Sequence, residues 1–225
     1  MNLTDSRPVQ DLRLFRLPEN FRGRSAWTVQ LWWLVQATLF NLSPQVLYGW
    51  RRWLLRLFGA TIGRGVLLRP SVQITYPWKV SIGDWSWIGD NVSLYSLGAI
   101  EIGENVVISQ NSYLCTGSHD FRKASFDIYA QKIVVEPESW IAADVFVAPG
   151  VRIGHGAVVG ARSTVLQDLP SMMVCHGNPA RSIRPRLDEW PSRDQLGGLK
   201  PGVDAVLQQA HHAKQWIKEG KQRSR

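Results

Sequence analysis

A histidine stands at the point where a regular sequence pattern breaks, and it is the strongest candidate for proton-transfer chemistry. His119 follows the segment Leu114-Cys-Thr-Gly-Ser118, and the pattern resumes near Ile133. An insertion that projects from a rigid scaffold is where function tends to lie, and imidazole is the side chain best suited to proton transfer near neutral pH. We therefore predict an acid–base role for His119. Asp120 either orients its ring or only turns the chain, and Asp127 is a second possibility.

The other residues with reactive side chains have weaker contexts. His155 occupies a corner position inside a regular part of the pattern, and the remaining histidines lie after it. Cys115 has no partner at the spacing that an activated nucleophile needs, and we expect a packed thiol. Cys115 and Cys175 also lack the spacing of a metal site, so no metal is predicted.

The pattern that positions His119 is a six-residue repeat. From Ile62 onward an aliphatic residue tends to return at every sixth position, with a small or β-branched residue four places later. The clearest block reads Ile141-Ala-Ala-Asp-Val-Phe, Val147-Ala-Pro-Gly-Val-Arg, Ile153-Gly-His-Gly-Ala-Val. The period matches neither an α-helix nor a simple strand. It is typical of a parallel β-helix, so we predict a mainly β fold.

Three hexads would form one triangular coil of about 18 residues, and coils would stack at about 4.8 Å. The aliphatic residues would point inward. The Gly, Asn or Asp that follows each of them would occupy a tight corner, where a positive φ is often needed. Residues 60–176, less the insertion, have room for roughly five or six coils.

A tryptophan-rich segment precedes the repeat. Residues 1–24 are polar and read as an extended arm, and residues 25–58 read as two helices. Ser25 is a suitable cap for the first helix. Pro44 suits the first turn of a second helix that ends near Gly59.

Two interpretations of this helical segment remain open. It could cap the open end of the β-helix, because unpaired strand edges must be covered. It could also be an interfacial membrane contact, with tryptophans at the headgroups and Arg51, Arg52 and Arg56 facing anionic lipid. The first helix is too short and too interrupted by polar residues to span a bilayer comfortably.

The chain therefore divides into three predicted regions. Residues 1–58 form the arm and the tryptophan-rich helices, residues 59–186 form the β-helix domain, and residues 187–225 form a C-terminal extension. A short helix is expected within that extension, from about Val203 to Lys218.

The net charge of +8 comes mainly from basic residues at the two ends of the repeat. Anionic small molecules or a lipid surface are more natural partners for this distribution than nucleic acid, for which no motif is present. No secretory signal opens the chain, so a cytoplasmic protein with reduced thiols is expected. A peripheral position at the inner face of the membrane is an open alternative.

Three segments outside the simple repeat resemble a known family. Thr116-Gly-Ser-His-Asp120, Trp140-Ile-Ala-Ala143 and Gly177-Asn-Pro-Ala-Arg181 resemble the hexapeptide-repeat acyltransferases. Within these the chain is similar to the colanic-acid-type O-acetyltransferases of exopolysaccharide biosynthesis, with the maltose and galactoside acetyltransferases as relatives. The resemblance covers about residues 45–186.

This resemblance implies a left-handed β-helix and a homotrimer whose active sites lie between adjacent prisms. It implies transfer of an acetyl group from acetyl-CoA to a hydroxyl of a sugar or polysaccharide precursor, in a direct ternary complex with His119 as general base and Asp120 beside it. Asp90 and Asn91 lie near the region that would bind the acceptor. The implied coenzyme A contacts are Ala143, Ala161, Leu166, Gln167, Arg181 and Arg184. Relatives often have Thr-Lys where this chain has Leu166-Gln167, so one cation near the coenzyme is missing.

Other functions remain possible from the sequence alone. A zinc carbonic anhydrase also uses this fold, but it needs three histidines around one metal, and His119 has no histidine a few residues away. A non-catalytic interaction module would use the coil as a rod. An acyltransferase could also take a non-sugar acceptor, although the tryptophan-rich segment favours a lipid-linked oligosaccharide.

Overall fold

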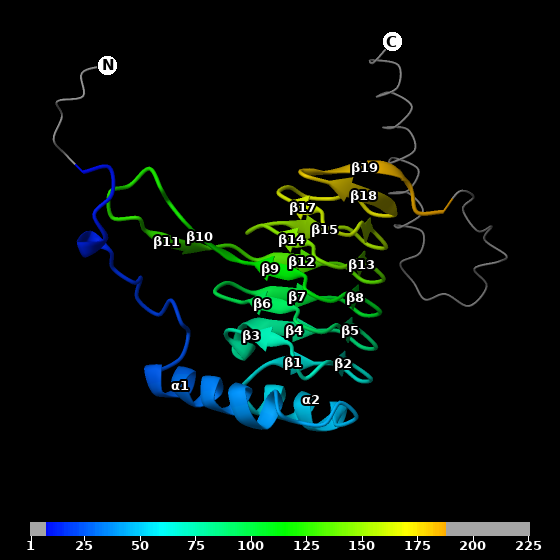
Figure 1. The fold of residues 1–225 in the computed structure, drawn as a ribbon, viewed down its shortest axis with the longest axis horizontal. Helices are drawn as coiled ribbons and strands as arrows, with labels where there is room; N and C mark the ends of the chain where they lie inside the picture. The colour runs from blue at the N-terminus through cyan, green and yellow to red at the C-terminus, as the bar shows by residue number, and fades with distance from the viewer. Residues whose placement is uncertain (1–7, 188–225) are drawn as a thin grey trace, which may run out of the picture.

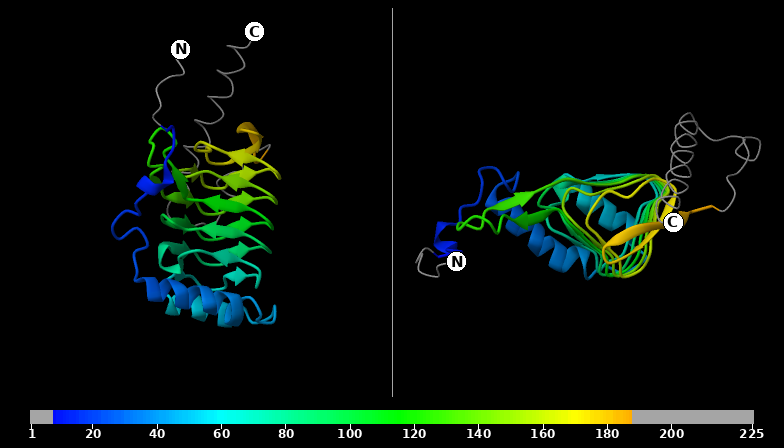
Figure 2. Two further views of the ribbon diagram at one scale, coloured as in Figure 1. Left: turned by 60° about the vertical axis from the view of Figure 1, so that its left-hand side comes forward. Right: turned by 90° about the horizontal axis from the view of Figure 1, so that it is seen from above.

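The structure is a computed structural model that describes residues 8–187, and most of these residues wind into a triangular prism of stacked coils. Three parallel sheets form the sides of the prism, and Figure 2 shows the triangular section from above. Five complete coils and the beginning of a sixth are present in this part of the chain. The predicted mainly β fold and the predicted number of coils are therefore confirmed.

The strands of each sheet come from successive coils. The first sheet contains β1 (Thr61–Ile62), β4 (Val80–Ile82), β7 (Ile100–Ile102), β12 (Ile133–Val135) and β15 (Arg152–Ile153). The second contains β2 (Leu67–Leu68), β5 (Trp87–Ile88), β8 (Val107–Ile108), β13 (Trp140–Ile141), β16 (Val158–Val159), β18 (Met173–Gly177) and the antiparallel β19 (Ala180–Pro185). The third contains β3 (Gln73–Ile74), β6 (Ser93–Tyr95), β9 (Tyr113–Cys115), β14 (Phe146–Val147) and β17 (Thr164–Val165).

The aliphatic residue of each hexad lies inside the prism, where it pairs in register with its counterpart in the next coil. Ile82 pairs with Ile102, and Val135 pairs with Ile153. All four side chains are buried in one continuous core. Burial of a side chain of this size contributes roughly 1.5–3 kcal/mol to the stability of the fold.

The glycine that follows the inward isoleucine has a different role from the one predicted. Positive φ occurs later in the hexad, as at Asn105 and Asn111. At Gly83, a Cβ atom would lie 2.5 Å from the backbone nitrogen of Glu104 in the next coil. At Gly103 it would lie 2.6 Å from the backbone nitrogen of Pro137. These glycines are therefore required by the close approach of two backbones.

Two helices cover the open end of the first coil. Helix α1 (Ala26–Val35) continues into a π-helical turn, η2 (Gln36–Phe40), and α2 (Tyr48–Leu57) follows. Short 3-10 turns lie at Leu12–Leu14 (η1) and Pro77–Lys79 (η3). Trp32, Phe40 and Leu55 are fully buried in the same core as the coils. The prediction of a cap is therefore confirmed.

Polar side chains of the cap satisfy the unpaired backbone groups of the first coil. Trp32 Nε1 donates to the carbonyl of Ile74 at 2.7 Å. Arg51 Nε donates to the carbonyl of Leu68 at 2.8 Å. Arg52 and Arg56 donate in the same way to the carbonyls of Val66 and Ile62. These three arginines therefore supply the donors that the exposed edge of the sheet needs, and a membrane contact of the segment stays a prediction.

The limits of the helices differ in part from the predicted ones. Ser25 caps α1 as expected, with its Oγ accepting from the backbone N–H of Thr28. The second helix begins at Tyr48 and not at Pro44. The carbonyl of Pro44 accepts from Arg51 Nη1 at 2.9 Å, which holds Pro44 in a turn before the helix. The expected helix from Val203 to Lys218 lies outside the described residues, and the three predicted domain boundaries stay predictions.

Candidate active site

The insertion that carries His119 leaves the prism between the third and the first sheet. It contains a short antiparallel hairpin of β10 (Gly117–His119) and β11 (Ile128–Ala130), which projects from the coils in Figures 1 and 2. Thr116 fixes the base of the hairpin. Its carbonyl accepts from the N–H of Gln131 at 2.8 Å, and its Oγ1 accepts from the N–H of Gly98 at the same distance. His119 is therefore held next to a rigid coil.

The hydrogen bond of the His119 ring determines its tautomer. Its Nδ1 lies 2.8 Å from the carbonyl oxygen of Phe126. A carbonyl oxygen can only accept a hydrogen bond, so Nδ1 carries the proton and the neutral ring has its lone pair on Nε2. Phe126 adopts a φ of 49°, and this turn directs its carbonyl toward the ring.

Two phenylalanines pack around the imidazole. The Phe126 ring stacks on His119 at 4.2 Å between centroids, with an angle of 8° between the planes. The Phe15 ring, from the N-terminal arm, lies 6.1 Å from His119. The arm is joined to the insertion by a hydrogen bond from the N–H of Asp11 to the carbonyl of Ala124. The arm therefore contributes one wall beside the proposed base.

Ion pairs hold the rest of the insertion. The Asp120 carboxylate accepts from Arg122 Nε at 2.9 Å, and this contact lowers the pKa of Asp120. Its backbone N–H donates to the carbonyl of Asp127. The Lys123 ammonium lies 2.9 Å from the Asp127 carboxylate and lowers the pKa of that group. Asp120 and Asp127 thus order the insertion, while Phe126 orients the ring.

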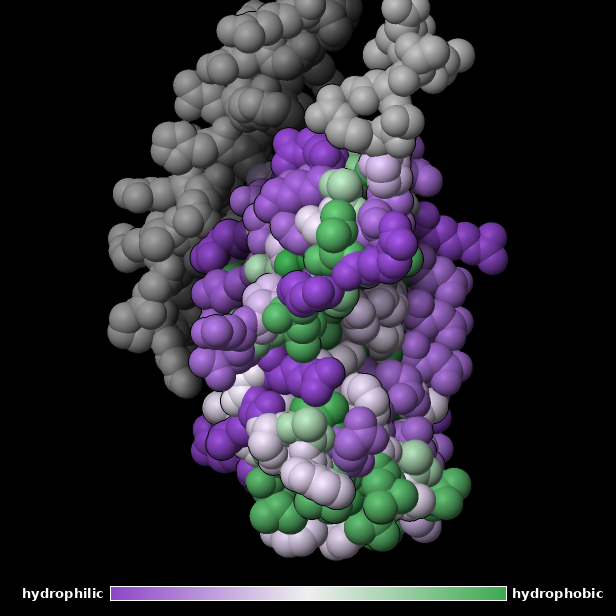
Figure 3. Space-filling model, turned by 90° about the vertical axis from the view of Figure 1, so that its left-hand side faces the viewer, coloured by the Kyte–Doolittle hydropathy of each residue, from purple (hydrophilic) through white to green (hydrophobic). Residues whose placement is uncertain are grey.

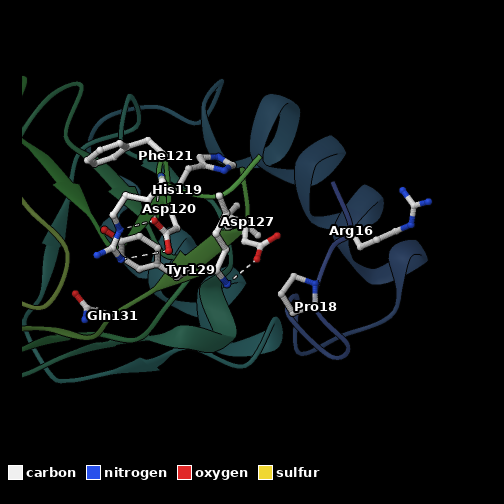
Figure 4. Close-up of a pocket in the computed structure, with 11 residues that line it drawn as sticks. Arg16, Pro18, His119, Asp120, Phe121, Asp127, Tyr129 and Gln131 are labelled. Atoms are coloured by element: carbon white, nitrogen blue, oxygen red, sulfur yellow. Dashed lines mark hydrogen bonds and ion pairs between the residues drawn. The ribbon is translucent and has the colours of Figure 1, made fainter. Parts of the chain in front are cut away.

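An open cleft of about 750 Å³ lies beside His119. Figure 4 shows side chains of the insertion around it, with Pro18 of the arm opposite and the Arg16 guanidinium directed away from the others. The cleft is lined by Arg16, Pro18, His119, Asp120, Phe121, Arg122, Lys123, Asp127, Ile128, Tyr129 and Gln131. Its mixed polar and aromatic lining suits a polar organic acceptor.

The residues predicted to bind coenzyme A lie mostly on another edge of the prism. We define the histidine edge as the corner between the third and first sheets, which includes residues 116–132 and 166–168. We define the alanine edge as the corner between the second and third sheets, which includes residues 89–92, 109–112, 142–145 and 160–163. These two edges border the third sheet on opposite sides.

Hydrogen bonds between successive coils align the alanine edge. The N–H of Arg162 donates to the carbonyl of Ala143, which places Ala161 and Ala143 one coil apart. The N–H of Asn111 donates in the same way to Asp90. Asp90 and Asn91 therefore lie on this edge too, and the Asp90 carboxylate accepts from Arg69 and Ser71.

The remaining predicted contacts are dispersed. Arg181 pairs with His176 at the end of the alanine edge, whereas Arg184 pairs with Val174 at the other end of β19. Leu166 and Gln167 are exposed on the histidine edge, two coils beyond the insertion. One copy of the chain therefore does not bring His119 together with Ala143, Ala161 and Arg181.

Sequence relatives identify the family. The chain is 61% identical over 180 residues to WcaF of Escherichia coli K12, which is named as an acetyltransferase of colanic acid biosynthesis, and the match covers 80% of this chain and 99% of WcaF. It is 33% identical over 138 residues to the galactoside O-acetyltransferase of the same organism, covering 60% of this chain and 68% of the relative. The chain belongs to the hexapeptide-repeat acetyltransferases. The predictions of this family and of an acyltransferase are thereby confirmed.

Solved structures of hexapeptide-repeat acetyltransferases share the fold. One from Vibrio cholerae, in complex with acetyl coenzyme A, superimposes with a TM-score of 0.67 at 28% identity, over 74% of this chain and 92% of that one. A galactoside acetyltransferase in complex with coenzyme A gives a TM-score of 0.66 at 27% identity, over 82% and 89% of the two chains. No protein-family model matches the chain.

Sequence reasoning missed Phe126, Phe15 and Pro18. Phe126 acts through its backbone carbonyl, which leaves no signal in its residue type, and the arm residues reach the site only through long-range folding. Between residues 8 and 187, no group of three or more His, Cys, Asp or Glu side chains is placed to hold a metal ion. In the same range no helix combines the length and apolar character needed to cross a bilayer.

Proposed function

We propose that this protein transfers an acetyl group from acetyl-CoA to a hydroxyl of a sugar or polysaccharide precursor, with His119 as the general base. The observation that carries the proposal is the hydrogen bond from His119 Nδ1 to the Phe126 carbonyl, because it leaves Nε2 able to accept a proton. The ring lines an open cleft beside a rigid coil. General base catalysis of this kind contributes typically 10²–10⁴-fold to a rate.

The proposed reaction is a direct transfer. The acceptor hydroxyl gives its proton to His119 Nε2 while its oxygen attacks the carbonyl carbon of the thioester. The C–S bond then breaks, the acetyl ester forms, and the imidazolium returns the proton to the departing thiolate of coenzyme A. The Phe126 carbonyl stabilises the imidazolium, since Nδ1–H is already directed at it. Holding both substrates in one cleft supplies the proximity contribution.

The geometry of one copy supports a shared site in a homotrimer. His119 and the alanine edge lie on opposite sides of the third sheet. If prisms pack side by side, the histidine edge of one copy faces the alanine edge of the next. Ala143 and Ala161 then present backbone groups to coenzyme A, because their side chains are too small to obstruct it. Arg181 at the end of that edge supplies positive charge for the phosphates.

The same arrangement gives roles to Asp90, Asn91 and Asp120, and the relatives indicate the class of acceptor. Asp90 and Asn91, on the alanine edge, are proposed to contact the acceptor in the shared site. Asp120 is proposed as a positioning residue, because its contacts order the hairpin that carries His119. The names of the colanic acid and galactoside relatives favour a saccharide, free or lipid-linked, in exopolysaccharide biosynthesis.

The test is an acetyl-CoA consumption assay with a panel of nucleotide sugars, free saccharides and lipid-linked oligosaccharides. Release of free thiol should depend on a saccharide, and mass spectrometry should show one added acetyl ester. Calorimetric binding of acetyl-CoA without turnover on any saccharide would point to a non-sugar acceptor. No binding of acetyl-CoA would refute the proposal.

A further inference from the structure

The outer face of the helical cap is apolar and faces away from the coils. Apart from Thr28 and Gln30, helix α1 consists of apolar residues, yet only Val29 and Trp32 of it are buried. A helix of this kind normally has partners on every side. Figure 3 shows hydrophobic residues gathered on the cap at one end of the molecule. We call this surface the cap face; its most exposed members are Trp27, Leu31, Leu34, Leu42, Val46 and Leu57.

The individual side chains of the cap face are highly exposed to solvent. Trp27 is 85% exposed, and Leu42 and Val46 are each 78% exposed. Trp50 and Trp53 extend the surface along α2, where their rings stack at 5.1 Å between centroids. Contiguous apolar surface on this scale normally marks an interaction site.

The charge around the cap face has one sign. No Asp or Glu occurs from residue 20 to residue 83, while Arg22, Arg24, Arg51, Arg52 and Arg56 lie in or beside the cap. The three arginines of α2 donate to backbone carbonyls, so their charges are not neutralised by a carboxylate. An apolar face with tryptophans and a positive surround is the pattern of an element that lies in a membrane interface.

We propose that the cap face binds the surface of an anionic phospholipid bilayer. Leucines and Val46 enter the boundary between headgroups and acyl chains, tryptophans lie at headgroup depth, and the exposed Arg22, Arg24 and Arg56 attract the anionic headgroups. The protein then lies on the membrane with the coils directed away from it. This binding does not depend on the proposed reaction.

A second copy of the chain is a less suitable occupant. A two-fold contact between two cap faces would place the same arginines against each other. Their like charges would repel, and no carboxylate in residues 20–83 could offset that repulsion. Anionic lipid supplies the missing negative charge together with an apolar phase.

The experiment is co-sedimentation of the full chain with vesicles of phosphatidylcholine alone or with added phosphatidylglycerol. The test variant carries Trp27→Gln, Leu34→Gln and Leu42→Gln, all at exposed positions. The control carries Trp87→Gln and Trp140→Gln, which are exposed on the second sheet. Circular dichroism and light scattering establish that each variant keeps its fold and its mass.

The wild type and the control should pellet with phosphatidylglycerol vesicles, and added salt should weaken this binding. The test variant should need at least about tenfold more lipid for half-maximal binding. A blue shift of wild-type tryptophan fluorescence on addition of vesicles gives an independent readout. The proposal is overturned if the wild type stays in the supernatant, if the test variant binds as well as the wild type, or if only the test variant loses oligomeric mass.

Discussion

The Nδ1 atom of His119 lies 2.8 Å from the carbonyl oxygen of Phe126, and the two rings stack at 4.2 Å. The same residue thus fixes the tautomer and the plane of the imidazole. A backbone carbonyl cannot be removed by substitution of its side chain, so this orientation depends on the turn at Phe126 and on the hairpin around it.

Substitution of the proposed base should abolish most of the activity. His119→Ala should lower kcat by at least about 10², because no other group at this position can take the proton from the acceptor. Calorimetric binding of acetyl-CoA should remain close to that of the wild type. The matched control is His155→Ala, a histidine in a regular corner whose Nε2 lies 3.6 Å from Glu138. Equal activity of the wild type and His119→Ala would exclude the assignment.

Mixed oligomers should reveal whether the site is shared. His119→Ala removes the base, and Ala161→Trp should block coenzyme binding at an exposed position of the alanine edge. Each variant alone should be inactive. Random mixing of the two in one trimer should restore about a quarter of the wild-type activity. About one site in four then combines an intact histidine edge of one copy with an intact alanine edge of the next. A mixture that stays inactive although exchange of subunits is demonstrated would show that each chain forms its own site.

The ion pair between Asp120 and Arg122 should make the insertion sensitive to acid. Arg122 holds the pKa of Asp120 below its ordinary value of 3.8. A depressed pKa adds stability above the ordinary value, and that stability is lost as the pH falls through the lowered pKa. The protection of the amides of residues 120–127 against exchange, relative to an unfolded chain at the same pH, should therefore fall as the pH drops below the ordinary value of 3.8. Asp120→Asn should show the reduced protection already at neutral pH, and Asp84→Asn in the second coil should not.

The same variants separate a positioning role of Asp120 from a catalytic one. Asp120→Asn should reduce kcat by less than His119→Ala does, and Asp120→Glu should recover part of the loss. A loss from Asp120→Asn as large as that from His119→Ala, without any rescue by glutamate, would instead place the carboxylate in the chemistry.

The arm should contribute to acceptor binding. The Phe15 ring lies 6.1 Å from His119, so Phe15→Ala should raise the KM of the acceptor. One aromatic contact of this kind corresponds to roughly a 2–10-fold change. The KM of acetyl-CoA should change little, and Leu14→Ala, at the neighbouring exposed position, provides the control. An equal rise in both KM values would indicate a general disturbance of the insertion.

The buried arginine of the cap should matter for stability. Arg51 is fully buried and donates to Leu68, Ser43 and Pro44. Arg51→Met would leave these acceptors without their donor, and we expect the free energy of unfolding in urea to fall by roughly 1–3 kcal/mol. Arg64→Met is the control, because its ion pair with Asp84 is exposed and such pairs contribute about 0–1 kcal/mol. Equal stability of Arg51→Met and the wild type would mean that water replaces the guanidinium at this edge.

Much of the scaffold could be read from local pattern. A six-residue period identifies inward positions such as Ile82 and Ile102, because each hexad repeats the same local geometry. The interruption before His119 marks the insertion for the same reason. The roles of Gly83 and Arg51 could not be read in this way. The backbone that closely approaches Gly83 belongs to the next coil, and the carbonyl that accepts from Arg51 belongs to the first coil.

The sequence by itself determined that hexads stack into coils, that the repeat breaks at His119, and that an apolar helical segment precedes it. These features depend on residue type and on spacing along the chain, which are local. Only the tertiary structure decided that the Phe126 carbonyl holds the ring, that the arm reaches the cleft, and that His119 and Ala161 lie on different edges of the prism. Backbone atoms and distances between coils carry those relationships, and no residue type encodes them.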